Sequence, residues 1–258
     1  MASLFDIAGK TALVTGGVNG LGRMIADGLL RAGVKVYVTS RKAAEADKAQ
    51  REMSQIGQCV ALVADLASAE AAVALANELK AREPALHILV NNAGRTWGAP
   101  LESFPDKAWP QVLTINVQVP FTLVRELLPL LRAAGASGDP ARVINIGSVA
   151  AIAVEPLSAY SYAASKAGIH QLTRVMAADL AHENITVNVI APGFFPTKMM
   201  AHINNVDEER EKLLSRIPLK RLGTPDDVAG LCIFLSSRAG SYFTGAELVI
   251  DGGLANCR

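Results

Sequence analysis

The sequence contains few cysteines and few aromatic residues, and neither sign of charge is in excess. Its three cysteines, Cys59, Cys232 and Cys257, are widely spaced and form no CxxC pair, so we expect no disulfide framework and a reducing compartment. Lys and Arg number 25 against 24 Asp and Glu, and the net charge of +1 gives no basic footprint for nucleic acid. With 5% aromatic residues and abundant Ala, Val, Leu and Gly, the composition suits helices packed on a parallel sheet.

A long hydrophobic run is also missing. The most apolar stretch, residues 143–154, is interrupted by Asn145, Gly147 and Ser148, whereas a membrane-spanning helix needs about 20 apolar residues. The N-terminal segment carries Asp6 and lacks the basic region and apolar stretch of a signal peptide. We therefore expect a cytoplasmic protein that binds neither membrane nor nucleic acid.

Short apolar runs alternate with longer amphipathic segments along all 258 residues. The runs predict strands at 11–15, 34–39, 59–63, 86–90, 142–146, 186–190 and 247–250. The amphipathic segments predict helices at 20–31, 43–55, 69–82, 107–132, 158–182 and 226–236. This alternation predicts a single-domain Rossmann fold over residues 1–258, a doubly wound α/β structure whose seven-stranded parallel sheet carries helices on both faces.

The first predicted strand leads into the glycine-rich turn Thr15-Gly16-Gly17-Val18-Asn19-Gly20-Leu21-Gly22, which opens a helix. Glycines there let backbone N–H groups approach a dinucleotide pyrophosphate, and the helix N-terminus adds partial positive charge. An ordinary tight turn is the alternative.

The second predicted strand ends in Ser40, Arg41 and Lys42, where NAD-specific enzymes place a carboxylate on the ribose 2′-hydroxyl. A hydroxyl followed by a guanidinium suits a 2′-phosphate, because Arg pairs bidentately with phosphate oxygens. Given the glycine turn upstream, this favours NADP(H) as the cofactor over NAD, and a solvated basic loop is the alternative.

Polar residues also follow the next three predicted strands. Asp65 either accepts a hydrogen bond from adenine or caps a turn or helix, and Asn91-Asn92-Ala93-Gly94 either borders the cofactor or forms a structural turn. Ser148 ends the fifth strand, and Tyr162 and Lys166 follow at i and i+4 of a predicted helix, so they share one face. A nearby ammonium stabilises a phenolate and lowers its pKa, as proton transfer to and from an alkoxide requires.

In this order the TGxxxGxG turn, Asp65, NNAG, Asn116, Ser148 and the YxxxK pair resemble the short-chain dehydrogenase/reductase family over essentially the whole chain. The resemblance implies that Tyr162 is the general acid that protonates the carbonyl oxygen and that Ser148 donates a hydrogen bond to the same oxygen. It implies that Lys166 binds the nicotinamide ribose and lowers the pKa of the tyrosine. It implies that Asn116 anchors a water linked to Lys166, with bracing of a helix irregularity as the structural alternative. The implied cofactor contacts are Gly16, Val18, Asn19, Gly20, Leu21, Gly22, Ser40, Arg41, Asp65, Leu66, Asn92, Ala93, Gly94, Tyr162, Lys166, Pro192, Gly193, Phe195 and Thr197.

Other chemistries fit the sequence less well. Enoyl reductases space Tyr and Lys seven apart, and the residue seven before Lys166 is Ala159. The four histidines show no metal-ligand spacing, and the segment around Ser148 lacks the second glycine of a GxSxG elbow. A non-catalytic NADPH sensor would keep the glycine turn, but it would not need all four of Asn116, Ser148, Tyr162 and Lys166.

The segment from about 194 to 215 is expected to cover the substrate, with Phe194, Met199 and Met200 lining it opposite Trp97, Ile152 and Val154. This apolar lining favours a fatty, polyketide-like or steroid-like ketone, and packing beneath the loop is the alternative. Residues 91–98, the segment ARVINIGSVA at 141–150 and the fourteen-residue interval from Ser148 to Tyr162 resemble bacterial NADPH-dependent 3-oxoacyl reductases, including the rhamnolipid-associated type.

That resemblance implies reduction of a 3-oxoacyl thioester or a similar hydrophobic ketone to a secondary alcohol, with a steroid-like or cyclic ketone as the alternative. Glu183 stands where related enzymes carry a basic residue that docks acyl carrier protein. The substrate is therefore attached to acyl carrier protein or to coenzyme A, or it is a free ketone. Relatives are usually tetramers built on two long helices, and the segments 107–132 and 158–182 suit such a homo-oligomer, dimer or tetramer, as well as packing within one chain.

Overall fold

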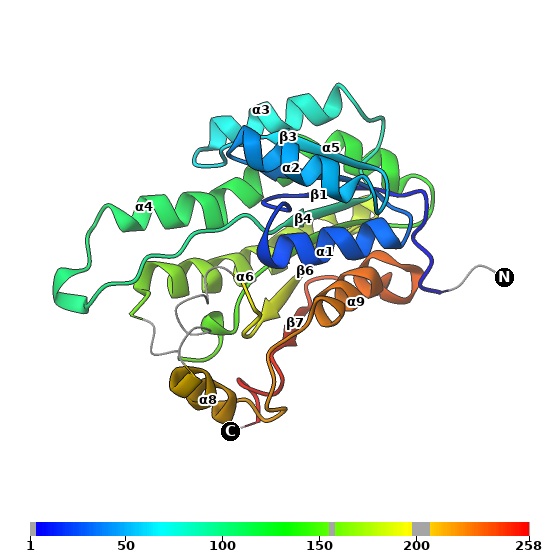
Figure 1. The fold of residues 1–258 in the computed structure, drawn as a ribbon. Helices are drawn as coiled ribbons and strands as arrows, with labels where there is room; N and C mark the ends of the chain where they lie inside the picture. Colours follow the sequence, from blue (N-terminus) through cyan, green and yellow to red (C-terminus); the bar gives the residue numbers. More distant parts are fainter. Residues whose placement is uncertain (1–3, 155–157, 198–206, 258) are drawn as a thin grey trace.

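The structure is a computed structural model that describes residues 4–154, 158–197 and 207–257. Its sheet has seven parallel strands in the order β3-β2-β1-β4-β5-β6-β7 (Figure 1). The strands are β1 (Thr11–Val14), β2 (Lys35–Ser40), β3 (Cys59–Val63), β4 (Ile88–Asn91), β5 (Ala141–Ile146), β6 (Ile185–Pro192) and β7 (Glu247–Ile250). The predicted fold class is confirmed, and each predicted strand lies within two residues of its observed bounds.

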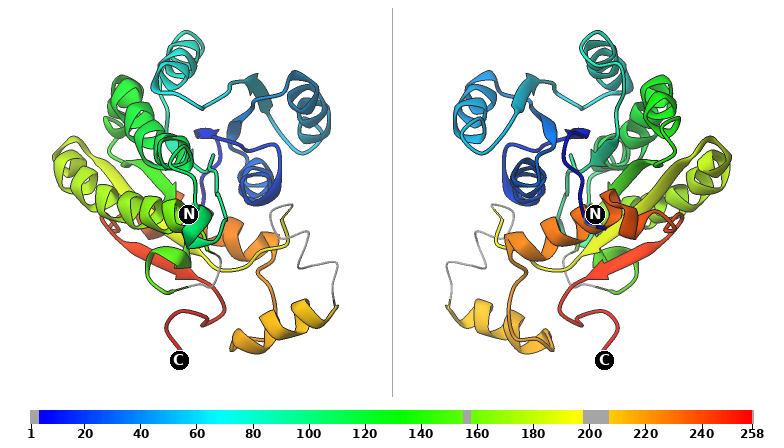
Figure 2. Two further views of the ribbon diagram at one scale, coloured as in Figure 1. Left: turned by 90° about the vertical axis from the view of Figure 1, so that its left-hand side faces the viewer. Right: turned by 90° about the vertical axis from the view of Figure 1, so that its right-hand side faces the viewer.

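Helices cover both faces of the sheet, as the two side views of Figure 2 show. The long helices are α1 (Gly20–Arg31), α2 (Ala43–Met53), α3 (Ala69–Lys80), α5 (Val119–Gly135), α6 (Tyr160–Leu180), α8 (Asp207–Arg216) and α9 (Pro225–Ser236). Shorter helices are α4 (Ala108–Leu113), the π turn η2 (Thr114–Gln118) and the 3₁₀ turns η1 (Leu101–Ser103), η3 (Val149–Ala151), η4 (Ala181–Glu183) and η6 (Arg238–Gly240). Within the described ranges, no helix is both long and apolar enough to cross a bilayer.

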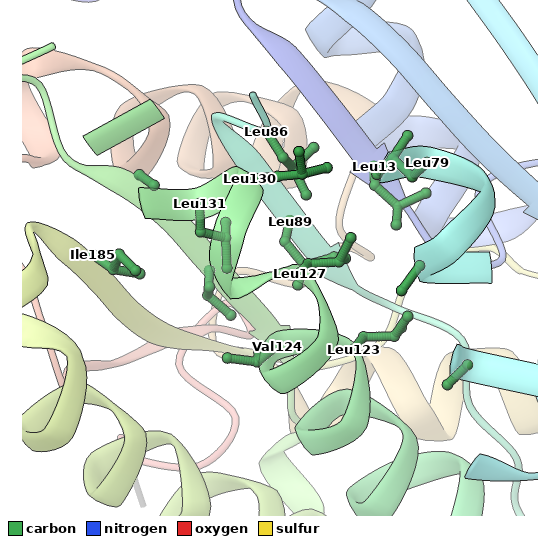
Figure 3. Close-up of a cluster of buried hydrophobic side chains, with 14 of the residues drawn as sticks. Leu13, Leu79, Leu86, Leu89, Leu123, Val124, Leu127, Leu130, Leu131 and Ile185 are labelled. Atoms are coloured by element: carbon green, nitrogen blue, oxygen red, sulfur yellow. The ribbon is translucent and has the colours of Figure 1, made fainter. Parts of the chain in front are cut away.

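Two hydrophobic cores follow from the alternation of side chains along each strand. On β1, Leu13 belongs to the core under α3, α5 and α6, whereas Ala12 and Val14 belong to the core under α1, α2 and α9. Figure 3 shows leucines of α5 and α3 meeting over the sheet, and the fully buried Leu79 and Leu127 each contribute about 2 kcal/mol. Burial on both faces explains why the strands are nearly continuous apolar runs.

Two predicted elements differ from the structure. The helix predicted at 107–132 is interrupted by the π turn η2, which follows α4 and precedes α5. Pro120 lacks the N–H that would donate to the carbonyl of Asn116 four residues earlier, so a regular α-helical turn cannot form there. The segment 194–215, expected to be a substrate-covering loop, contains most of α8, and Leu213 of α8 and Ile217 just after it belong to a small apolar cluster with Val149.

The carboxyl end of α9 is held by two cations, the buried Arg142 and the partly buried Lys10, on the opposite edge of the sheet from the glycine turn. Arg142, 1% exposed, donates from Nε to the Leu235 carbonyl (3.1 Å) and from a terminal nitrogen to the Ser237 carbonyl (2.9 Å). Lys10 Nζ donates to the Ser236 carbonyl at 2.8 Å, and Asp139 pairs with both cations. These contacts satisfy the last carbonyls of the helix and place positive charge at the negative end of its dipole.

We predict that Arg142→Met lowers the free energy of unfolding by about 3 kcal/mol, because removing one partner of a buried ion pair leaves the other groups desolvated and unpaired. Urea unfolding at a fixed protein concentration measures this loss. Arg132→Met is the control, since the ion pair of Arg132 with Glu183 lies on the surface and is expected to contribute little. An equal loss in both variants would contradict the assigned role of Arg142.

Candidate active site

The side chains of Ser148, Tyr162 and Lys166 meet where β5 ends against α6. Tyr162 and Lys166 lie one turn apart on α6, and Lys166 Nζ is 5.5 Å from the centre of the Tyr162 ring. Lys166 is 6% exposed, and its Nζ donates to the Ile146 carbonyl at 2.7 Å. The structure therefore brings together the three side chains that the sequence predicted as catalytic.

Burial controls the ionisation of this group. It lowers the pKa of Lys166 to about 8, because a charged ammonium is poorly solvated there. Burial also raises the pKa of the Tyr162 phenol, and a hydrogen bond with Ser148 only partly opposes this. We expected Lys166 to lower the pKa of the tyrosine; in the structure burial raises this pKa, only Ser148 opposes the rise, and the ammonium donates to the Ile146 carbonyl.

The main chain around Ser148 is fixed by several hydrogen bonds. The Gly147 N–H donates to the Ile190 carbonyl of β6 at 2.7 Å, and the Ala150 N–H donates to Ser148 Oγ at 3.1 Å. The Ser148 N–H donates to Nε2 of His170 at 3.3 Å. His170 was weighed in the sequence only as a metal ligand; its position one turn after Lys166 on the same face of α6 was the signal for this contact.

Asn116 is 3% exposed and lies in the π turn η2, which is the kind of helix irregularity that its alternative role, bracing the main chain, requires. Its Nδ2 donates to the Arg95 carbonyl and to Ser165 Oγ, both at 2.9 Å, and its Oδ1 accepts from the Arg95 N–H at 2.9 Å. Asn116 thus ties the segment after β4 to the helix that carries Tyr162. Its role in holding a water for Lys166 stays a prediction.

The glycine turn brings the start of α1 against the end of β4. Gly16 and Gly20 have φ angles of +63° and +56°, which other residues rarely adopt. A Cβ on Gly22 would lie 2.3 Å from Nδ2 of Asn92, which itself donates to the Thr15 carbonyl at 2.8 Å. No side chain caps α1, and its first turn has no acidic residue, so its N-terminal N–H groups can receive an anion. The turn fits the pyrophosphate of a dinucleotide.

Other predicted cofactor residues lie beside this turn. A Cβ on Gly20 would lie 3.5 Å from Cγ2 of Thr197, so the segment after β6 reaches the start of α1. Gly193 packs closely on Asp251, and the Phe195 ring is buried against Gly223, while the Phe195 carbonyl accepts from the Thr197 N–H at 2.8 Å. Asn92, Ala93 and Gly94 follow β4, and Pro192 ends β6.

The end of β2 presents the groups predicted for a 2′-phosphate. Ser40 is 5% exposed, and its Oγ accepts from the Lys42 N–H at 3.3 Å and lies 3.4 Å from a carboxylate oxygen of Glu45. Lys42 pairs with Glu45 at 3.3 Å, whereas Arg41 is exposed and forms no ion pair with the rest of the described chain. The Arg41 guanidinium therefore can bind a phosphate.

The two interpretations of Asp65 are separated by the helix that follows it. Ser68 is the N-cap of α3, and its side chain accepts from the Ala71 N–H at 3.3 Å. Asp65 is exposed and does not cap this helix, while the neighbouring Leu66 is buried. A contact of Asp65 with adenine remains a prediction.

The predicted substrate residues are less closely grouped. Ile152 and Val154 are 42% and 89% exposed, and Trp97 is half-buried, with Arg95 and Lys107 within 6 Å of its ring. Phe194 packs with Val149 and α8 and lines a cavity of about 440 Å³ that none of the predicted catalytic side chains borders. For Phe194 the structure therefore agrees with the alternative of packing beneath the segment rather than lining the substrate. Met199 and Met200 lie outside the described residues.

The chain was compared with known proteins. A family model described as Enoyl-(Acyl carrier protein) reductase matches residues 16–255. A Pseudomonas aeruginosa protein named rhamnolipids biosynthesis 3-oxoacyl-[acyl-carrier-protein] reductase is 49% identical over 254 residues, which are 98% of this chain and 99% of that protein. Galactitol 2-dehydrogenase (L-tagatose-forming) of Cereibacter sphaeroides is 37% identical over 97% of each chain.

A solved structure gives the same result. The Pseudomonas aeruginosa RhlG/NADP active-site complex matches with a TM-score of 0.96 at 47% identity, over 99% of this chain and 100% of that chain. The family model's description names an enoyl reductase, but Ala159 directly precedes α6 here and the tyrosine stands four residues before the lysine. Since both the sequence and the fold match along the whole chain, the protein belongs to the short-chain dehydrogenase/reductase family and is an oxidoreductase.

Proposed function

We propose that this protein uses NADPH to reduce the ketone of a 3-oxoacyl thioester to a secondary alcohol. The observation that carries the proposal is the meeting of Ser148, Tyr162 and Lys166 at the end of β5. The relative named a 3-oxoacyl reductase and the solved NADP complex support the reaction and the cofactor. When bound, NADPH supplies a hydride from C4 of its nicotinamide ring.

The chain's own residues supply the proton and hold the ketone. Tyr162 is protonated at neutral pH because burial raises the pKa of its phenol, so its hydroxyl is an acid ready to donate to the carbonyl oxygen. Ser148 Oγ donates a hydrogen bond to the same oxygen and orients it. Lys166 is positively charged below about pH 8, and its charge favours the phenolate that remains after the proton has left.

Charges on the surface support a proposal for the carrier of the acyl group. Glu183 forms a two-point ion pair with Arg132 of α5, one contact being 2.9 Å, so Arg132 is engaged by a carboxylate rather than free for an acidic carrier protein. At the segment after β4, the cations of Arg95 and Lys107 lie beside Trp97 and form no ion pair with other described residues. These charges suit the phosphates of coenzyme A, and we propose a coenzyme A thioester.

We also propose that the protein is a cytoplasmic homo-oligomer. Apolar side chains of the helices α4, α5 and α6 are partly exposed in the single chain: Trp109, Leu113, Phe121 and Val175. Contact with a second copy would remove this surface from water. The three cysteines are free, which suits a reducing compartment.

The first test follows NADPH oxidation with acetoacetyl-coenzyme A, acetoacetyl-pantetheine, an acetoacetyl carrier protein and a hydrophobic cyclic ketone. We expect turnover of the thioesters, lowest KM for the coenzyme A form, and loss of at least 1000-fold in kcat for Tyr162→Phe with an unchanged Kd for NADPH. Tyr160→Phe is the control, since Tyr160 packs on Phe104 and takes no part in proton transfer. Turnover of the cyclic ketone alone would contradict the thioester, and full activity of Tyr162→Phe would contradict the acid.

A second prediction concerns the cofactor. Arg41→Asp should raise the KM for NADPH by about 10- to 100-fold and leave that for NADH unchanged or lower, because a charge-assisted hydrogen bond to the 2′-phosphate is lost. Arg51→Asp, an equal change of charge on the exposed side of α2, is the control. An unchanged ratio of the two KM values in Arg41→Asp would exclude this phosphate contact.

A third prediction concerns the buried lysine. Because the pKa of Lys166 is lowered from 10.5 to about 8, the unfolded chain binds more protons than the folded one between these pH values, and stability rises with pH there. Below pH 8 the buried charge therefore destabilises the fold by up to about 3 kcal/mol. Lys166→Met should be inactive but more stable than the wild type at pH 7, with a difference that shrinks towards pH 10.

Unfolding by urea without cofactor at several pH values measures this difference. Lys48→Met, at a lysine whose side chain is 72% exposed, should show no such pH dependence. A constant difference between Lys166→Met and the wild type from pH 7 to 10 would mean that the ammonium is not destabilising.

A further inference from the structure

A buried histidine lies directly behind the catalytic serine. His170 stands on α6, one turn after Lys166, and is 3% exposed. Its Nε2 accepts a hydrogen bond from the Ser148 N–H at 3.3 Å, and its Nδ1 lies 2.9 Å from a carboxylate oxygen of Glu247 on β7. The ring packs so closely on Gly147 that a Cβ there would lie 2.0 Å from Nε2. The histidine therefore links β7 to the end of β5.

These two contacts determine which ring nitrogen carries the proton. Nε2 accepts from a backbone N–H and so has no proton, which places the proton on Nδ1, where it is donated to Glu247. Glu247 is held in turn by Arg174, whose terminal nitrogen donates to the same carboxylate oxygen at 3.1 Å. The ring is required to be neutral, since a proton on Nε2 would oppose the Ser148 N–H.

The charged groups around His170 come from α6 and β7. Burial lowers the pKa of the imidazole, and the positive charges of Lys166 and Arg174 act in the same direction. The carboxylate of Glu247 opposes them, but the resulting pKa stays below the ordinary value. The environment thus agrees with the neutral form that the hydrogen bonds require.

The backbone of Ser148 depends on this contact. The preceding N–H, on Gly147, is paired with β6, whereas the N–H of Ser148 donates to a side chain from another element. An unpaired N–H at this buried position is unfavourable, and the main chain would shift to find another partner. Such a shift would move Ser148 Oγ away from the Tyr162 hydroxyl with which it shares the carbonyl oxygen.

We propose that His170, in the tautomer set by Glu247, is a positioning residue for the reduction, holding Ser148 in register with Tyr162. The proposal rests on the ketone reductase activity proposed above. It extends the set of residues needed for catalysis to β7, on which no residue of the predicted site lies.

A matched pair of variants separates the two contacts of the ring. In His170→Gln the amide reaches the position of Nε2 and accepts from Ser148, whereas in His170→Asn it reaches that of Nδ1 and pairs only with Glu247. We expect His170→Gln to keep kcat within about threefold, and His170→Asn to lose about 10- to 100-fold in kcat with unchanged Kd for NADPH. His182→Asn, at an exposed histidine, is the control.

Equal kcat losses in the Gln and Asn variants, in proportion to their losses of Tm, would mean that His170 only packs, and would overturn the proposal. Normal kcat in His170→Asn would also overturn it. Independently, labelling the four histidines with ¹⁵N shows by NMR which nitrogen of His170 is protonated. We expect a proton on Nδ1 and none on Nε2 in the wild type; a protonated Nε2 would refute the contact with Ser148.

The NMR measurement also separates this proposal from the proposed function. If the wild-type protein reduced no ketone but His170 showed the expected tautomer, the reductase assignment would fail while the link between Glu247, His170 and Ser148 stood. If the wild-type protein reduced the ketone but His170 carried its proton on Nε2, the reductase assignment would stand and the link to Ser148 would fail.

Discussion

The polar contacts between one face of α6 and the end of β5 are the constraint on which the candidate active site depends. Lys166, His170 and Thr173 lie at i, i+4 and i+7, and each reaches a different residue at this end: the Ile146 carbonyl, the Ser148 N–H and the Asn145 side chain. Where only apolar side chains are in contact, a helix can shift along a sheet with a modest loss of stability. Buried hydrogen bonds allow only one alignment, because any other leaves polar groups unpaired. That alignment sets the position of Tyr162 relative to Ser148.

The same contacts place groups in the interior that do not favour folding. The ammonium of Lys166 is buried without a carboxylate partner among the described residues, and the polar chain from Thr173 through Asn145 to Asn91 crosses two strands of the core. Ser158, just before α6, has a φ of +45°, a conformation that is strained for a residue with a side chain. The apolar cores on both faces of the sheet and the cation-held end of α9 offset these effects. Part of the strain and desolvation in the described chain therefore lies beside the predicted catalytic side chains.

The sequence predicted best what depends on local pattern. The strands, the glycine turn and the Tyr162–Lys166 pair follow from periodicities of two and 3.6 residues and from positions where only glycine fits. The π turn was hidden within a continuous amphipathic pattern, and Pro120 was its one local sign. α8 was missed because its segment, DEEREKLLSR, is highly charged and has few apolar residues to mark a helical face. The role of His170 could not be seen, since Glu247 lies 77 residues further along the chain and only the fold brings them together.

The predicted cofactor and proton-transfer residues and the predicted substrate residues lie on different parts of the fold, which explains how relatives with this fold differ in substrate. The groups that would hold the cofactor and transfer the proton belong to strand ends, to α1 and to α6, and those at the end of β5 and on α6 are positioned by buried hydrogen bonds. The predicted substrate residues belong instead to segments that follow β4, β5 and β6, where Trp97, Ile152 and Val154 are partly or largely exposed. Changes there leave the contacts between α6 and β5 intact, so a galactitol dehydrogenase and a 3-oxoacyl reductase can share the same framework. In this chain Arg95 links the two groups of residues: Asn116 holds its backbone next to the helix that carries Tyr162, while its guanidinium lies beside Trp97, one of the predicted substrate residues.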